Sequence, residues 1–176
     1  ATWLRAVMAE LERIANHLGD IGAICNDASF ALMHNECGML REQVLRVVDG
    51  CFGHRLMMDC LVPGGVIADL DPAGSGRIGR LLDHIDRRMP ELIELYDNTA
   101  SLQDRTVGTG RLGSELAARF ACGGVIGRAS GRAFDVRCQL PYAPYDVVMP
   151  ALTVLQEGDV DARVRVRLAE VSASTA

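Results

Sequence analysis

The sequence predicts a mostly α-helical fold with irregular Gly- and Pro-rich loops and at most minor β structure. Two long stretches, residues 4–21 and 78–96, repeat apolar side chains at three- and four-residue steps, which is the spacing of one helix face. Hydrophobic residues make up 49% of the 176 residues, which is enough to bury one core, and the net charge is only -5. Because the chain shows no repeat and no linker, we expect residues 1–176 to form a single helical domain.

The first predicted helix, over residues 4–21, has one apolar and one polar face. Val7, Leu11 and Leu18 belong to the apolar stripe. A charged helix face is usually solvated, but carboxylates and histidines that become covered acquire shifted pKa values and can handle protons. The polar face carries Glu10, Arg13, His17, Asp20 and Asp27.

A second helix and a turn are predicted next along the chain. Asn35 is expected to cap this helix, which continues to Cys51 and ends at Gly53. Residues 61–66 (LVPGGV) form a predicted turn, because paired glycines allow backbone angles that other residues avoid. We expect residues 69–76 to form a loop.

Pro90 lies inside the second strong apolar stripe. Proline removes one backbone donor and clashes with the preceding turn, so it either kinks a helix or ends it. Ile85, Met89 and Tyr96 keep one apolar face on both sides of Pro90. We therefore expect one kinked helix instead of two.

The remainder of the chain gives weaker signals. We expect residues 103–111 to be irregular, residues 114–120 to form a short helix, and residues 123–146 to supply the Gly-, Pro- and Arg-rich loops. Residues 160–168 alternate apolar and polar side chains, which is the period of a β-strand.

Several functional classes are excluded by composition. All 18 basic residues are Arg, and without Lys the chain has neither a P-loop nor a Schiff base to pyridoxal phosphate. The acidic net charge disfavours nucleic acid as a partner. None of the six cysteines forms a C-x-x-C motif, and buried, reduced thiols are expected. No apolar run reaches the roughly 20 residues of a membrane helix.

Three short motifs carry little information by themselves. Residues 74–79 (GSGRIG) and 108–113 (GTGRLG) match the dinucleotide pattern G-x-G-x-x-G, but neither follows a buried strand. His34 and Cys37 have the spacing of two metal ligands on one helix face, but two ligands do not make a site.

Residues 10–23 (ELERIANHLGDIGA) resemble the large catalytic subunit of energy-converting, membrane-bound NiFe hydrogenases of the formate-hydrogenlyase type. The same family contains the quinone-site D-type subunit of respiratory complex I. Further matches follow in the family's order: 41–42 (RE), 53–55 (GHR), 63–66 (PGGV), 105–110 (RTVGTG), 127–131 (GRASG), 135–137 (DVR) and 141–146 (PYAPYD).

The resemblance implies that residues 1–176 are the middle of a longer subunit. The family's two nickel-binding cysteine pairs are absent here, so no cofactor is expected in this fragment, and a Ni–Fe centre belongs to the full-length subunit. The alternative is a complex I-like parent that never binds nickel. The resemblance also implies a helix over residues 160–168, with Asp159 as its cap.

The implied function is that of an oxidoreductase subunit. By resemblance, the intact enzyme transfers electrons between iron–sulfur clusters in a small partner subunit and either protons and hydrogen or a quinone, with NAD involved only indirectly. The subunit would lie peripherally on the cytoplasmic side of the inner membrane. The fragment alone is expected to be inactive. The alternative is a non-enzymatic helical scaffold that docks partner subunits.

Four residues are the candidates for the site. The resemblance aligns Asp27 with the acidic residue of the complex I quinone pocket, and we expect Asp27 and His17 to handle protons. Arg128 and Arg132 are expected to line the active-site cleft, since a fixed guanidinium stabilises negative charge. The alternative for each arginine is a salt bridge that holds the glycine-rich loop.

Overall fold

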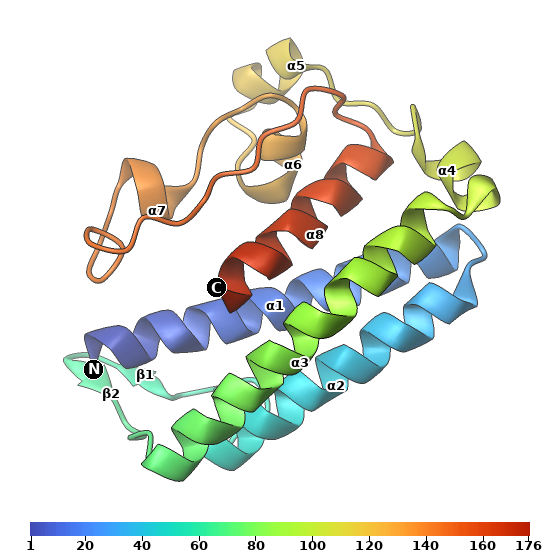
Figure 1. Ribbon diagram of the computed structural model, residues 1–176. Helices are drawn as coiled ribbons and strands as arrows, with labels where there is room; N and C mark the ends of the chain where they lie inside the picture. Colours follow the sequence, from blue (N-terminus) through green and yellow to red (C-terminus); the bar gives the residue numbers. More distant parts are fainter.

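Four long helices form the body of the molecule in the computed structural model, which describes residues 1–176. Helix α2 (Ala31–Phe52) packs along both α1 (Thr2–Asp27) and α3 (Pro72–Asp97), and α8 (Val160–Thr175) lies against α1 and α3 (Figure 1). The prediction of a mostly α-helical fold is confirmed.

Short elements connect the long helices. The β structure is one two-residue hairpin, in which β1 (Leu61–Val62) pairs antiparallel with β2 (Gly65–Val66) at the predicted turn. Four short helices lie between α3 and α8, and α6 packs on the side of α8 that faces away from α3 (Figure 1). They are α4 (Ala100–Thr106), α5 (Ser114–Arg119), α6 (Gly124–Ala129) and α7 (Val136–Gln139).

The apolar stripes read from the sequence are the core of the bundle. Leu11 and Leu18 of α1 and Ile85 of α3 are almost completely buried, as the helix period requires. Cys25 and Cys37 belong to the same core, and burial raises the pKa of their thiols to about 11 and about 12. These two side chains therefore pack as small apolar groups.

Two predicted helix starts were wrong. Helix α2 begins at Ala31 instead of Asn35, because Met33 and Cys37, four residues apart, are both buried and extend the apolar face upstream of Asn35. Helix α3 already begins within the expected loop, at Pro72. There the Asp71 side chain accepts a hydrogen bond from the Gly74 amide, and proline suits the first helical position.

Two other loop expectations also need correction. Residues 100–106 form the short helix α4, although residues 103–111 were expected to be irregular; Leu102 and Thr106, four residues apart, are both buried there. The Gly-rich stretch after residue 123 contains the single turns α6 and α7, and the Asp135 side chain caps α7. The short helix predicted over residues 114–120 is confirmed as α5.

Helix α8 settles the alternation of residues 160–168 in favour of a helix. Val164, Leu168 and Val171 bury one face in the main core, whereas Ala162 and Val166 bury the other against α6. The two buried faces are offset by two residues, so apolar and polar residues alternate in the sequence. A helix that is buried on opposite sides therefore has the apolar pattern of a β-strand. The Asp159 side chain caps the helix by accepting from the Ala162 amide at 2.8 Å.

Pro90 lies within a continuous helix α3, as predicted. Its ring is on the exposed face, while Met89 beside it is buried. Replacing Pro90 with Ala restores one backbone hydrogen bond and removes the clash with the preceding turn. We expect Pro90→Ala to raise the free energy of unfolding by about 1 to 3 kcal/mol.

Urea denaturation followed by circular dichroism measures this change. Glu94→Ala, at an exposed position of the same helix, is the matched control and is expected to stay within about 0.5 kcal/mol of the unchanged protein. Destabilisation by Pro90→Ala would show that α3 depends on the proline conformation.

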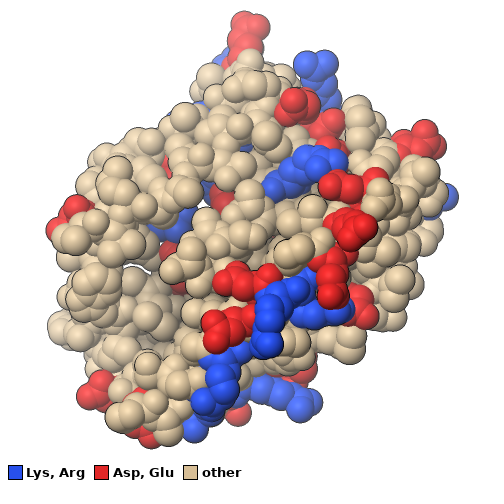
Figure 2. Space-filling view, in the orientation of Figure 1, with Lys and Arg blue, Asp and Glu red and all other residues tan.

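The surface divides into a charged and an uncharged region. Figure 2 shows a band of charged side chains along α3, whereas the surface around the N-terminus and α7 is largely uncharged. None of the helices is both long and apolar enough to span a bilayer. The large apolar side chains exposed near the N-terminus, the hairpin and α7 are Trp3, Leu61, Val62, Ile67, Val136, Leu140, Tyr142, Val147, Val148 and Met149.

Candidate functional site

Asp27 lies exposed at the C-terminal end of α1, beside an open cavity of about 430 Å³. Arg105 lines the same cavity and donates a hydrogen bond to the backbone carbonyl of Ala28, not to the Asp27 carboxylate. Asp27 has no hydrogen bond and no ion pair in this chain. Its carboxylate is therefore exposed to solvent at this cavity.

His17 is not close to Asp27. The two are ten residues apart on one helix, which corresponds to about 15 Å along its axis. The His17 side chain is buried against α8, where its Nε2 atom lies 2.7 Å from Oε2 of Glu170. The structure thus separates the two candidate proton-handling residues.

Glu170 holds a buried ion pair with Arg128. Both Nε and Nη2 of Arg128 lie 2.6 Å from Oε1 of Glu170, and the Arg13 guanidinium is 3.6 Å from Oε2. Burial by itself would raise the pKa of Glu170, but the hydrogen bond from His17 and the charge of Arg128 outweigh it and hold the pKa below its usual value. Glu170 is therefore a carboxylate.

A second group of charges continues the network toward the N-terminus. Arg137 bonds both Glu10 and Asp135 at 2.9 Å, and Ser174 donates to Glu10 at 2.6 Å. Burial opposes ionisation of Asp135, but the hydrogen bonds and charge of Arg137 lower its pKa to about 2. The Tyr145 hydroxyl also donates to Glu10, and burial together with that carboxylate raises the pKa of Tyr145. The Glu10 carboxylate is thus fully hydrogen-bonded.

The two groups form one charge-balanced cluster. Asp135, which pairs with Arg137, also lies 3.5 Å from Arg128, the partner of Glu170, and so connects the two groups. Three carboxylates face three guanidiniums, and the balance holds when the His17 imidazole is neutral. We call this set the Glu170 cluster: Glu10, Arg13, His17, Arg128, Asp135, Arg137 and Glu170.

The two candidate arginines occupy different places. Arg128 is only 3% exposed and points into the Glu170 cluster, which is the salt bridge that was the alternative for it. Arg132 lies outside the cluster: it donates to the Cys122 carbonyl at 2.7 Å and stacks over Phe134. Neither arginine lines the cavity beside Asp27 or the groove between α1 and α2.

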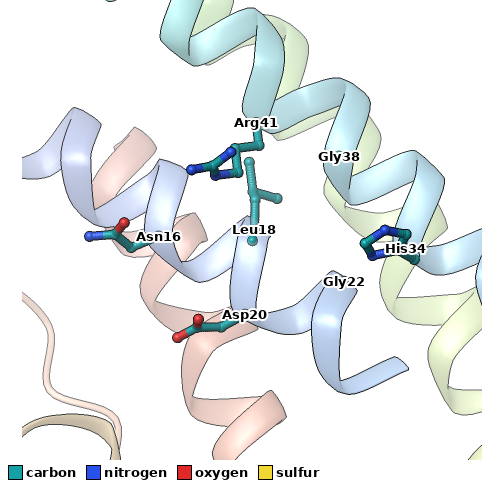
Figure 3. Close-up of a pocket in the computed structure, with 8 residues that line it drawn as sticks. Asn16, Leu18, Asp20, Gly22, His34, Gly38 and Arg41 are labelled. Atoms are coloured by element: carbon teal, nitrogen blue, oxygen red, sulfur yellow. The ribbon is translucent and has the colours of Figure 1, made fainter. Parts of the chain in front are cut away.

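A groove of about 370 Å³ runs between α1 and α2 (Figure 3). Gly22 lets the helices approach closely, since a Cβ there would lie 3.2 Å from the Cβ of Cys37. His34 and Arg41 project from α2, and Asp20 projects from α1 toward the side of α8 (Figure 3). His34 is exposed whereas Cys37 is buried, so they do not form a metal-ligand pair.

The chain offers no ligand set for a Ni–Fe centre. No group of three or more His, Cys, Asp or Glu side chains is arranged to hold a metal ion. The six cysteines are all unpaired thiols, and the core pair Cys25 and Cys37 remains protonated. The residues present therefore do not fit a Ni–Fe centre.

Sequence reasoning missed Glu170, Asp135 and Arg137 as members of the site. A usable signal existed in α8, because residues 163, 167, 170 and 174 follow helical steps of four, three and four. These four polar side chains face α1 and the loops around α6. The strand-like alternation of the same segment concealed this face.

Comparison with protein families gives one match over most of the chain. The model described as "Respiratory-chain NADH dehydrogenase, 49 Kd subunit" matches residues 25–176. This range includes Asp27, Arg128, Asp135, Arg137 and Glu170.

Curated relatives are similar over nearly the whole chain. The C/D protein of the NADH-quinone oxidoreductase from Bacteroides thetaiotaomicron is 35% identical over 172 residues, 98% of this chain and 32% of the relative. The carbon monoxide-induced hydrogenase of Rhodospirillum rubrum is 31% identical over 99% of this chain and 48% of the relative. Formate hydrogenlyase subunit 5 of Escherichia coli is 30% identical over 97% of this chain and 30% of the relative.

A solved structure shares the fold. A chain of the membrane-bound sulfane sulfur reductase, an archaeal respiratory membrane complex, superposes with a TM-score of 0.91 at 23% identity, over 99% of this chain and 47% of that chain. The present chain thus spans between about a third and a half of the length of the proteins it matches.

Proposed function

Because this chain belongs to the 49 kDa-subunit family of respiratory-chain NADH dehydrogenases, we propose that it is part of the catalytic subunit of a membrane-associated oxidoreductase. The match over residues 25–176 carries this proposal, since it includes Asp27 and most of the Glu170 cluster. The enzyme would transfer electrons between an iron–sulfur chain and either quinone or protons and hydrogen. The relatives' names include both kinds of enzyme and favour an oxidoreductase over the scaffold alternative.

The proposed partners are the other subunits of a membrane-bound complex, including an iron–sulfur small subunit. Two relatives are named as subunits, and the structural neighbour is a chain of a respiratory membrane complex, which supports partners in general. The exposed apolar surface around Trp3 and Val148 supports contacts at that end of the molecule.

The proposed location is peripheral, on the cytoplasmic side of the membrane, with NAD acting only through other subunits. We propose that iron–sulfur clusters are held by a partner, and that any Ni–Fe centre is held by parts of the subunit outside residues 1–176.

Asp27 has the position of a proton donor and acceptor in this proposal. Its carboxylate faces an open cavity without a partner, so that protonation breaks no interaction inside the chain. Asn has the same shape and cannot titrate. In the assembled enzyme we expect Asp27→Asn to reduce turnover or coupled proton movement about 100-fold, which is the low end of acid–base catalysis.

Turnover of the assembled complex with quinone, and separately with protons as electron acceptor, measures this effect and identifies the acceptor. Glu12→Gln is the matched control, because Glu12 is an exposed, unpaired acid on the same helix. Both variants are expected to leave the stability of the isolated chain within about 0.5 kcal/mol. Unchanged turnover and coupling in Asp27→Asn would show that Asp27 is only a solvated residue on the helix surface, without a role in proton transfer. A complex without redox activity towards either acceptor would favour the scaffold.

A further inference from the structure

The two ring nitrogens of His17 lie in different surroundings. Nε2 contacts the carboxylate of Glu170 at 2.7 Å, whereas Nδ1 has no hydrogen-bond partner in the protein. The polar side-chain atoms that are sealed from solvent without a partner are Arg13 Nε, Ser130 Oγ and Arg163 Nε. Since His17 Nδ1 is not among them, this atom keeps contact with solvent.

The charge on Glu170 decides which ring nitrogen carries the proton. Arg128 donates twice to one carboxylate oxygen, and Arg13 approaches the other, so Glu170 is ionised. An ionised carboxylate only accepts hydrogen bonds. The ring nitrogen that faces it must therefore be a donor, which makes neutral His17 the Nε2–H tautomer with a free lone pair on Nδ1.

Charged side chains surround the His17 ring. These charged side chains come from every element that packs against the ring, namely α1, α6, the segment at α7, and α8. A neutral ring leaves the cluster balanced, and a proton added at Nδ1 gives an imidazolium whose Nε2–H still bonds an ionised carboxylate. The facing charges are Glu10, Arg13, Arg128, Asp135, Arg137 and Glu170.

We infer that Glu170 is a positioning residue, which fixes His17 as the Nε2–H tautomer and so makes Nδ1 the proton-accepting atom. The donor is water or another small hydroxyl that reaches the ring edge: its O–H bond breaks, a proton and no electron moves to Nδ1, and hydroxide or alkoxide remains until it is reprotonated from solvent. The role in turnover rests on the proposed function, whereas the tautomer does not.

Replacing Glu170 with Gln is expected to invert the tautomer. Gln has one side-chain acceptor and one NH₂ donor. Because Arg128 is purely a donor, it takes the amide oxygen, and the NH₂ group then faces His17. The ring must accept this bond at Nε2 and carry its proton on Nδ1 instead.

Nitrogen-15 NMR of the histidine rings distinguishes the two tautomers in the 176-residue chain, at a pH at which the rings are neutral. We expect a proton on Nε2 in the unchanged protein and on Nδ1 in Glu170→Gln. Glu10→Gln is the matched control: it makes the same change in the same cluster without touching His17, and it is expected to keep the proton on Nε2.

A proton on Nδ1 in the unchanged protein would overturn the inference, and this spectrum is decisive even if Glu170→Gln does not fold. A folded Glu170→Gln that keeps the proton on Nε2 would overturn it as well. The readout needs no partner subunit and no turnover. A failure of the proposed oxidoreductase function in the assembled complex would therefore not change the tautomer result. A failure of the tautomer inference would likewise not contradict the proposed function.

Discussion

Replacing Glu170 with Ala is expected to lower the free energy of unfolding by about 3 to 5 kcal/mol, because it leaves the buried Arg128 guanidinium with only the more distant carboxylate of Asp135, at 3.5 Å. Arg128 is only 3% exposed, and two of its nitrogens bond Glu170. The same substitution also removes the partner of His17. Urea denaturation of the chain, followed by circular dichroism, measures the loss.

Glu42→Ala is the control for this prediction. Glu42 pairs with both Arg46 and Arg55, but on the surface, where water replaces the lost interactions. It is expected to destabilise far less than Glu170→Ala. If the two substitutions lowered the free energy of unfolding equally, burial would not increase the contribution of the Glu170 ion pairs to stability, and the prediction would be wrong.

The largest expected effect of a small substitution is at Gly158, immediately before the Asp159 cap. Its φ of +69° is unfavourable for other residues, and an added Cβ would lie 2.0 Å from the carbonyl oxygen of Leu112. The backbone cannot move away easily, because Gly158 bonds Leu112 through its carbonyl and Ala129 through its amide, both at 2.8 Å. We expect Gly158→Ala to cost more than about 4 kcal/mol or to prevent folding.

Gly124→Ala separates the steric clash from the backbone strain. Gly124 also has a positive φ, of +58°, but nothing lies within 4 Å of an added Cβ. The strain alone predicts a loss of about 1 to 2 kcal/mol. Thermal unfolding of both variants makes the comparison, and equal losses would mean that the clash with Leu112 is relieved by movement.

The parts of the fold that sequence predicted are those with one buried face. Helices α1 and α3 show a single apolar stripe, which is visible locally, and Pro90 did not hide it because the stripe stays in phase. Helix α8 is buried on two sides, so local periodicity favoured a strand; only the resemblance and the Asp159 cap indicated a helix. The start of α2 was misplaced because tertiary burial of Met33 outweighed a possible cap at Asn35.

Only some members of the candidate site, and none of their pairings, could be predicted from the sequence. His17 and Arg128 were both identified from sequence, yet their common partner, Glu170, was one of 23 acidic residues, and the strand-like alternation concealed the polar helix face to which it belongs. It lies 153 positions from His17, and no spacing rule connects residues so distant. Asp27 belongs to the polar face predicted for the first helix, and its exposed position is the usual one for such a face.

The pairing of α1 with α8 also has a consequence for biosynthesis. The ribosome releases α1 first, yet the carboxylate that pairs with His17 is made 153 residues later. At roughly 5 to 20 residues per second, the wait is on the order of 10 to 30 seconds. During this time the nascent α1 can already pack against α2, but the face that α8 covers in the folded chain lacks this cover until α8 is made.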